Sequence, residues 1–122
     1  MKDKLILVGL ALLLSACAAS QGNVDNIRGQ TALINFNDSK AIVMEMLGVP
    51  GDRSFKGTDE AWQYCSTGFN NDTYATIWFS NNKVTAISSK DGQWAVGSCS
   101  QSFPSVDWGQ RPADQIIDVN VN

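Results

Sequence analysis

The stretch that decides the fold runs from Thr73 to Ser89 and reads TYATIWFSNNKVTAISS. Aromatic and β-branched residues fill both of its halves, and such residues favour strands. The two asparagines between the halves, Asn81 and Asn82, are typical of a tight two-residue turn. The stretch therefore predicts a β-hairpin with strands at 73–80 and 83–89.

A two-residue turn fixes which residues face each other across this hairpin. Counting outward from Ser80 and Lys83 predicts three facing pairs on one side of the sheet: Phe79 with Val84, Ile77 with Ala86, and Ala75 with Ser88. We assign this side to a covering helix. The opposite side carries Tyr74, Trp78 and Ile87, and it is too aromatic to be left bare without a reason.

The aromatic side has two interpretations. In the first, Tyr74, Trp78 and Ile87 bind a partner protein, because aromatic anchors dominate the energy of interfaces. In the second, the C-terminal segment folds back and covers this side as a small second core. Three aromatic residues of that segment could supply the cover: Trp94, Phe103 or Trp108.

The residues before the hairpin predict a third strand and a helix. Ala61–Ser66 (AWQYCS) predicts a strand, joined to the hairpin by a turn at Phe69–Asp72, and the charged residues 51–60 predict a loop. Asn37–Pro50 (NDSKAIVMEMLGVP) predicts a helix of about ten residues whose apolar stripe must find a sheet. Its expected caps are Asp38 or Ser39 at the start and Gly48 before Pro50 at the end, and its stacked pairs are Ile42 with Met46 and Val43 with Leu47. The predicted fold class is α+β, with the helix on a three-stranded antiparallel meander.

The C-terminal segment is irregular apart from its two ends. Gln93–Ser100 predicts a strand or extended segment, Ser102–Pro112 has no regular pattern, and Ile117–Val121 predicts a final strand. Cys99 in this segment and Cys65 in the first strand form an even pair, which predicts a disulfide in an exported protein. Two free thiols or a two-ligand metal site are the alternatives, and the metal site fails because the chain has no His and no CxxC spacing.

The first residues of the chain predict export. A charged start, an apolar run from Leu5 to Leu14 and small residues before Cys17 are typical of a secretory signal. A membrane-spanning helix is the alternative, but it needs roughly 20 apolar residues. With Cys17 in first mature position, the segment Leu14-Ser15-Ala16-Cys17 resembles the lipobox of bacterial lipoproteins. The resemblance implies cleavage after residue 16, diacylglycerol on the Cys17 thiol, and further acylation such as palmitate on the new amine. The predicted domains are then a signal peptide (1–16), a flexible tether (17–30) and one folded domain (31–122).

Composition and missing residue types exclude several function classes. Without Lys2, Asp3 and Lys4, which leave with the signal, seven Lys and Arg oppose eleven Asp and Glu, and an acidic chain argues against nucleic-acid binding. The chain has no His to act as a general base near neutral pH. The adjacent carboxylates Asp59 and Glu60 should point to opposite sides of a strand, so they cannot share a proton. Residues 70–72 (NND) fit turn chemistry better than a cation site. We predict no enzyme, cofactor or metal.

Several motifs together resemble the SmpA/OmlA (BamE-like) family of outer-membrane lipoproteins. They are the lipobox, Ser39-Lys40 opening a helix, Leu47-Gly48-Val49-Pro50 closing it, Trp62-Gln63-Tyr64, and the hairpin Phe79–Val84. The resemblance covers about residues 37–89 and implies a helix pair on a three-stranded antiparallel meander, similar to half of a β-lactamase inhibitor protein. The family has Gly just before the helix, where this chain has Asn37, the residue that best replaces Gly at positive φ. The cysteine pair and the segment from Trp94 onward lie outside the family pattern, as an added, disulfide-tied extension.

The resemblance implies a non-catalytic lipoprotein that binds other envelope proteins, such as barrel-assembly subunits, and assists the assembly or maintenance of outer-membrane proteins. Ala18 after the lipidated Cys resembles lipoproteins sorted to the outer membrane, facing the periplasm. The alternative function is a tethered inhibitor or exclusion factor that blocks an envelope enzyme or receptor.

Overall fold

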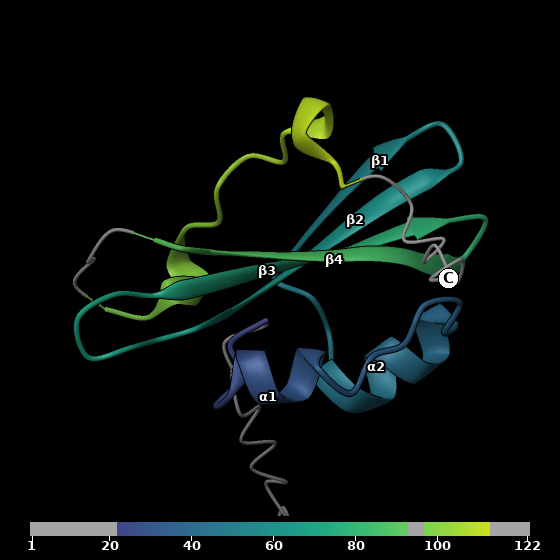
Figure 1. Ribbon diagram of the computed structural model, residues 1–122. Helices are drawn as coiled ribbons and strands as arrows, with labels where there is room; N and C mark the ends of the chain where they lie inside the picture. The colour runs from purple at the N-terminus through teal and green to yellow at the C-terminus, as the bar shows by residue number, and fades with distance from the viewer. Residues whose placement is uncertain (1–21, 93–96, 113–122) are drawn as a thin grey trace, which may run out of the picture.

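The fold is α+β, with one antiparallel sheet covered on both faces. The computed structural model describes residues 22–92 and 97–112. In chain order its elements are α1 (Ile27–Thr31), α2 (Lys40–Leu47), β1 (Asp52–Lys56), β2 (Asp59–Ser66), β3 (Thr73–Ser80), β4 (Lys83–Asp91), and the 3-10 turns η1 (Cys99–Gln101) and η2 (Trp108–Gln110). Figure 1 shows α1 and α2 on one face of the sheet and residues 97–112 arching over the other. We call residues 97–112 the tail, and the two faces the helix face and the tail face.

The sequence prediction of a loop at residues 51–60 and a sheet of three strands is wrong, because residues 52–56 form strand β1. β1 pairs antiparallel with β2, so the sheet has four strands in the order β1-β2-β3-β4. The prediction missed β1 because its sequence, DRSFK, carries three charges and little apolar pattern. Charged residues are typical of edge strands, whose outer side faces water. β1 occupies such an edge.

The turn of the β3–β4 hairpin is the predicted one. Asn81 and Asn82 have φ values of 49° and 66°, and a two-residue turn with two positive φ angles matches the twist of the flanking strands. The predicted pair Phe79–Val84 next to this turn is confirmed. The sequence therefore gives the correct register up to this pair.

A bulge beyond this pair shifts the register by one residue. On β3 it lies between Trp78 and Phe79, so Trp78 faces Ala86 and Thr85 becomes the extra residue on β4. One extra residue moves every later side chain of its strand to the other face. The predicted pairs Ile77–Ala86 and Ala75–Ser88 are therefore wrong, and the structure has instead Ile77 facing Ile87 and Ala75 facing Ser89.

Helix α2 begins and ends where the sequence predicts. The Ser39 hydroxyl accepts a hydrogen bond from the Ile42 amide, and Gly48 ends the helix with a φ of 75°. Asn37 has a φ of 74°, as expected for a residue in the place of a glycine. Of the predicted stacked pairs, Val43 and Leu47 are buried, whereas Ile42 is exposed and Met46 is only partly buried. The helix therefore packs through a narrower stripe than predicted.

The predicted flexible tether is too long, because residues 22–30 belong to the folded domain. Asn26 caps helix α1 by accepting a hydrogen bond from the Gly29 amide. Before it, the Val24 amide donates to the Cys65 carbonyl at 2.8 Å, and the Cys65 amide donates to the Gly22 carbonyl at 2.7 Å. β1 pairs only with residues 59–63 of β2. Residues 22–24 pair with Cys65, farther along the same edge of β2. A sequence without periodicity gives no sign of this pairing.

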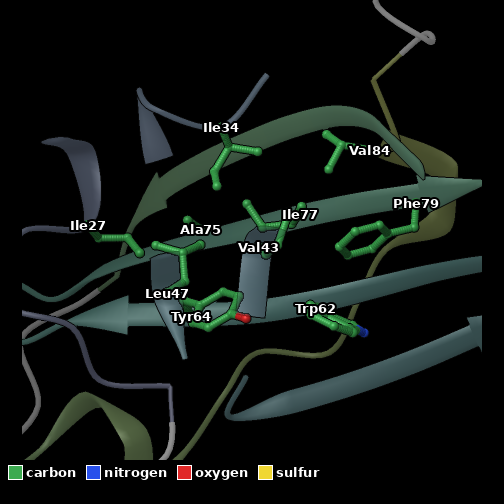
Figure 2. Close-up of a cluster of buried hydrophobic side chains, with 10 residues drawn as sticks. All are labelled: Ile27, Ile34, Val43, Leu47, Trp62, Tyr64, Ala75, Ile77, Phe79 and Val84. Carbon is green, nitrogen blue, oxygen red and sulfur yellow. The ribbon is translucent and has the colours of Figure 1, made fainter. Parts of the chain in front are cut away.

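The main core lies between the helices and the sheet, as Figure 2 shows. Ten buried hydrophobic residues form it: Ile27, Ile34, Val43, Leu47, Trp62, Tyr64, Ala75, Ile77, Phe79 and Val84. The Trp62 and Phe79 rings are 4.7 Å apart. The Tyr64 hydroxyl donates to the Gly48 carbonyl at 2.8 Å and so ties the end of α2 to the sheet. Burial raises the pKa of Tyr64, which keeps this donor protonated.

Candidate functional site

The structure places the three predicted partner-binding residues apart, and none of them forms an open surface. Trp78 is only 4% exposed, and Tyr74 is partly buried on the same face. The bulge puts Ile87 on the helix face, where it packs against the main core. Of the two interpretations of this aromatic side, the covering tail describes the protein.

Aromatic residues of the tail supply the cover. Phe103 meets the Tyr74 ring edge-on at 5.8 Å, and Trp108 meets the Trp78 ring edge-on at 5.3 Å. The Tyr74 hydroxyl donates toward the carbonyls of Cys99 and Ser102, at 3.4 and 3.2 Å. Burial, followed by the charge of Asp72, raises the pKa of Tyr74 and favours this donor. Trp94 and the predicted strand at Ile117–Val121 lie outside the described residues.

A disulfide fastens the first end of the tail. The predicted bond between Cys65 and Cys99 is confirmed, and both cysteines are buried. The Cys99 amide also donates to the Thr67 hydroxyl at 3.1 Å. Cys99 begins a 3-10 turn, where the sequence predicted a strand or extended segment.

Polar contacts fasten the second end. Arg111 pairs with the Asp59 carboxylate and donates to the Thr85 hydroxyl at 3.1 Å. The Ser80 hydroxyl donates to Asp59 at 2.7 Å. This hydrogen bond, followed by the Arg111 contacts, lowers the pKa of Asp59. The tail is thus held at both ends, by a covalent bond and by an ion pair.

Between its ends the tail roofs a polar cavity of about 160 Å³. Its floor is a row of polar residues across three strands, in which Thr76 faces both Gln63 on β2 and Ser88 on β4. Residues 104–107 form the roof, and Tyr74 and Trp78 also line the cavity. Sequence reasoning missed this cavity, although Gln63 between the apolar Trp62 and Tyr64 was a signal.

Gln63 is the unusual member of this floor. Its side chain is 2% exposed, and its Nε2 donates to the Pro104 carbonyl at 2.8 Å. Among the described residues, its Oε1 has no hydrogen-bond partner. A buried carbonyl oxygen left without a donor costs about 1–3 kcal/mol, so Gln63 lowers the stability of the tail face.

The adjacent carboxylates Asp59 and Glu60 point to opposite faces, as predicted. Asp59 meets Arg111 of the tail, whereas Glu60 is buried on the helix face and pairs with Lys40 of α2. The Trp62 indole donates to the other Glu60 oxygen at 2.5 Å. Both Glu60 oxygens are thus engaged, which gives this ion pair a structural role between α2 and the sheet.

The turn at residues 70–72 keeps a local role. One carboxylate oxygen of Asp72 accepts from the Gly68 amide at 3.4 Å, and the Gly92 amide donates to the Asp72 carbonyl at 2.6 Å. Within residues 22–92 and 97–112, no three His, Cys, Asp or Glu side chains group as a metal site would require.

The outer side of the helix layer carries large apolar residues that nothing in the described chain covers. Four of them are 40–61% exposed: Leu33, Phe36, Ile42 and Val49. All four lie in α2 or in the segments that flank it, and we call them the helix-layer surface. Sequence reasoning missed it, because it assigned Ile42 to the buried stripe. The signal was the position of Ile42 one residue before Val43, which turns it away from the sheet.

The predicted lipidation site, Cys17, lies outside the described residues, which begin at Gly22. Among the helices that the structure describes, none has the length and apolar character needed to cross a membrane. Comparison with known proteins adds no relative, since no family model, curated protein or solved structure matches the chain.

Proposed function

We propose that this protein is a non-catalytic, lipid-anchored envelope protein that binds other envelope proteins through its helix-layer surface. The observation that carries the proposal is the contrast in exposure between the two covers of the sheet. The tail hides Trp78 almost completely, whereas Leu33, Phe36, Ile42 and Val49 stay 40–61% exposed. Burying side chains of this size contributes on the order of 1 kcal/mol or more each. Apolar side chains that become fully desolvated form the centre of a protein–protein interface.

The anchor restricts where the partner can be. Acyl chains on Cys17 would hold the protein at a membrane surface, which we place at the outer membrane, facing the periplasm. Four residues lie between Cys17 and Gly22, where the described fold begins, and the five residue-to-residue steps span about 17 Å when extended. The folded domain would therefore stay close to the membrane, and its partner would have to reach that surface.

The fold is compatible with the SmpA/OmlA type of accessory protein. That family's arrangement is a helix pair on an antiparallel meander, and here α1 and α2 pack on β2, β3 and β4. Strand β1 and the fastened tail are additions to that pattern. We propose a role in the assembly or maintenance of outer-membrane proteins, with barrel-assembly subunits as the first partners to test.

The anchor is tested by mass spectrometry of the protein purified from membranes. We expect a mature chain that begins at Cys17 and carries diacylglycerol on its thiol. The variant Cys17→Ser should move from the membrane fraction to the soluble fraction. An unmodified amino terminus ahead of residue 17 would contradict the anchor.

The binding surface is tested by identifying the proteins that leave the membrane with the lipidated chain in mild detergent. The test variant is Leu33→Ser with Phe36→Ser. The matched control is Phe55→Ser with Phe69→Ser, which removes two apolar side chains that are at least as exposed, at sites outside the helix layer. We expect partners to be lost from the test variant alone.

The identity of those proteins decides between the two roles. Barrel-assembly subunits in the eluate support the accessory role, whereas a single soluble or foreign target would replace it with the tethered inhibitor. Equal recovery of partners from both variants would contradict the assignment to the helix-layer surface.

A further inference from the structure

We propose that strand β1 pairs antiparallel with β1 of a second copy of this chain, centred on Ser54, so that the two sheets join at their edges. The pairing uses the sheet edge and not the helix-layer surface. The inference depends on three observations: the open edge of β1, the direction of its free backbone groups, and a five-residue sequence that is complementary to itself.

Strand β1 is the open edge of the sheet. It is the first strand in the order β1-β2-β3-β4, and no described segment other than β2 pairs with it. The opposite edge, β4, is partly occupied by the same chain. There the Asn37 amide donates to the Val84 carbonyl at 2.8 Å. Farther along β4, Asp91 pairs with Arg28 of α1. A second copy therefore finds more free backbone at β1.

Two residues of β1 direct their backbone groups outward. Facing residues of an antiparallel ladder alternate between pairs that exchange two hydrogen bonds and pairs that exchange none. Lys56 and Asp59 close a two-residue turn, and the pair that closes such a turn exchanges hydrogen bonds. Every second residue counted from Lys56 therefore bonds to β2, which leaves the amides and carbonyls of Arg53 and Phe55 to point outward.

These free groups match those of a second copy. When two β1 strands run antiparallel with Ser54 opposite Ser54, Arg53 of each copy lies opposite Phe55 of the other. Both residues have outward backbone groups, so the two Arg53–Phe55 pairs exchange four hydrogen bonds. A register shifted by one residue would place these groups opposite residues that already bond to β2.

The side chains that this register brings together are also complementary. On the tail face, Asp52 of each copy lies opposite Lys56 of the other, and opposite charges that face each other across strands stabilise a sheet. On the helix face, where the Arg53 guanidinium lies 4.9 Å from the Trp62 ring, Arg53 lies opposite Phe55, and a cation attracts an aromatic ring. Phe55 is 68% exposed in the single chain. Charges that protect an edge act against pairing, but here every charge of β1 meets an opposite charge or a ring.

The symmetry keeps the proposed partner surface available. The two-fold axis of such a strand pair runs perpendicular to the sheet, so the helix layers of both copies face the same way. Each copy keeps its own helix-layer surface free, and the partner test described above does not depend on the pairing.

The pairing is weak between free copies and favoured on a membrane. One five-residue strand buries much less than the roughly 1,200–2,000 Å² of a stable protein interface. The lipid anchor of the proposed function confines the copies to one surface and so raises their effective concentration. Only this step rests on that anchor, because the complementarity of β1 does not require it.

The test is disulfide formation between copies of the lipidated, full-length chain in its membrane. In the proposed register Ser54 lies opposite its own copy in a pair without hydrogen bonds, where Cα atoms are about 4.5 Å apart. A disulfide spans about 4.4–6.8 Å between Cα atoms. Ser54→Cys should therefore give a disulfide-linked dimer under mild oxidation. The matched control, Ser89→Cys on the exposed part of β4, should stay monomeric.

Two charge variants test the register in the Ser54→Cys background. Asp52→Lys places Lys opposite Lys twice, and Lys56→Glu places Glu opposite Asp twice, so each alone should lower the yield of dimer about fivefold or more. When the two variants are expressed together, opposite charges face each other again at both positions. The mixed dimer should then form as readily as the dimer of Ser54→Cys itself, and its recovery also shows that both variants fold.

Three results would overturn the proposal. Ser54→Cys could give no more dimer than Ser89→Cys, either charge variant alone could form the dimer as readily as Ser54→Cys does, or the mixture could fail to restore it. The comparison of Ser54→Cys with Ser89→Cys is decisive by itself, so the test survives if a charge variant fails to fold.

Fractionation before oxidation separates this proposal from the anchor. A membrane-bound chain that forms no dimer contradicts the pairing, whereas a chain in the soluble fraction contradicts the anchor. In that second case the purified chain is oxidised at increasing concentration. A dimer that grows with concentration in Ser54→Cys alone then supports the pairing, and its absence contradicts it.

Discussion

The two faces of the sheet are covered in different ways. On the helix face, α1 and α2 close a core of ten buried hydrophobic residues. On the tail face, the buried cluster has only Ala61, Trp78 and Ala86, with Val106 and Trp108 packed on it. A helix satisfies its own backbone hydrogen bonds, so an apolar stripe is enough to dock it. The tail has such bonds only in its two short 3-10 turns, and it is fastened at both ends instead, through Cys99 and Arg111.

The difference assigns most of the protein's stability to the inner side of the helix layer and leaves its outer side for the proposed partner binding. The helix face supplies most of the buried apolar area, and its outer side stays available to a partner. The tail face buries fewer apolar groups, and its polar row is left with a cavity. The predictions that follow start with the change of largest expected effect.

Phe79→Ala should be the most destabilising single change. Phe79 is fully buried against Trp62 in the main core, and truncating a buried Phe to Ala costs about 3–5 kcal/mol. Urea unfolding measured by circular dichroism would give the loss. A loss below about 1 kcal/mol would mean that the helix face is not the main core.

Removing the disulfide with Cys65→Ser and Cys99→Ser should cost about 3.5–4 kcal/mol, because the bond restricts the unfolded chain over a separation of 34 residues. Hydrogen exchange followed by mass spectrometry should show faster exchange in residues 97–112 than in α2. Equal loss of protection in both covers would contradict the tail's dependence on its fastening.

Trp108→Ala should destabilise the protein less than Phe79→Ala does, by about 1–2 kcal/mol. Trp108 is only partly buried, and its edge-on contact with Trp78 is worth about 0.5–1.5 kcal/mol beyond area burial. The emission of Trp78 should shift to longer wavelength as its ring becomes wetter, with Trp62 unchanged as the internal reference. A loss of unfolding free energy equal to that of Phe79→Ala would mean that the two faces contribute equally to stability.

Acid should loosen the Arg111 end of the tail. The lowered pKa of Asp59 means that its contribution to stability is fully present above the unfolded value of about 3.9 and is lost as the pH falls through the folded value. Ser80→Ala removes the largest cause and should raise the pKa of Asp59 toward its usual value. A carboxyl-carbon NMR titration measures both. An unchanged Asp59 pKa in Ser80→Ala would exclude that hydrogen bond as the cause.

The parts of the fold that the sequence predicts are those with local causes. Helix α2 begins after Ser39 and ends before Gly48, because capping depends on neighbouring amides and carbonyls. Asn81 and Asn82 form the turn because their backbone tolerates positive φ. The cysteine pair is not local, and it was predicted from the even number of remaining cysteines together with the predicted export.

The parts that the sequence misses depend on distant partners. β1 and residues 22–24 pair along the same edge of β2, which neither segment shows in its own pattern. The bulge at Trp78 reassigns Ile87 to the helix face, and no local signal marks it. The cavity arises from the path of the tail over Gln63, and the sequence marks it only by a polar residue between Trp62 and Tyr64.

The most direct test of a closed tail face is a nuclear Overhauser measurement on the full-length oxidised protein at neutral pH. The rings of Trp78 and Trp108 are centred 5.3 Å apart, and those of Tyr74 and Phe103 are centred 5.8 Å apart. We predict cross-peaks between the ring protons of both pairs, with slow exchange of the Trp78 indole proton. Absent cross-peaks, together with an indole proton that exchanges as freely as that of an exposed tryptophan, would contradict this account.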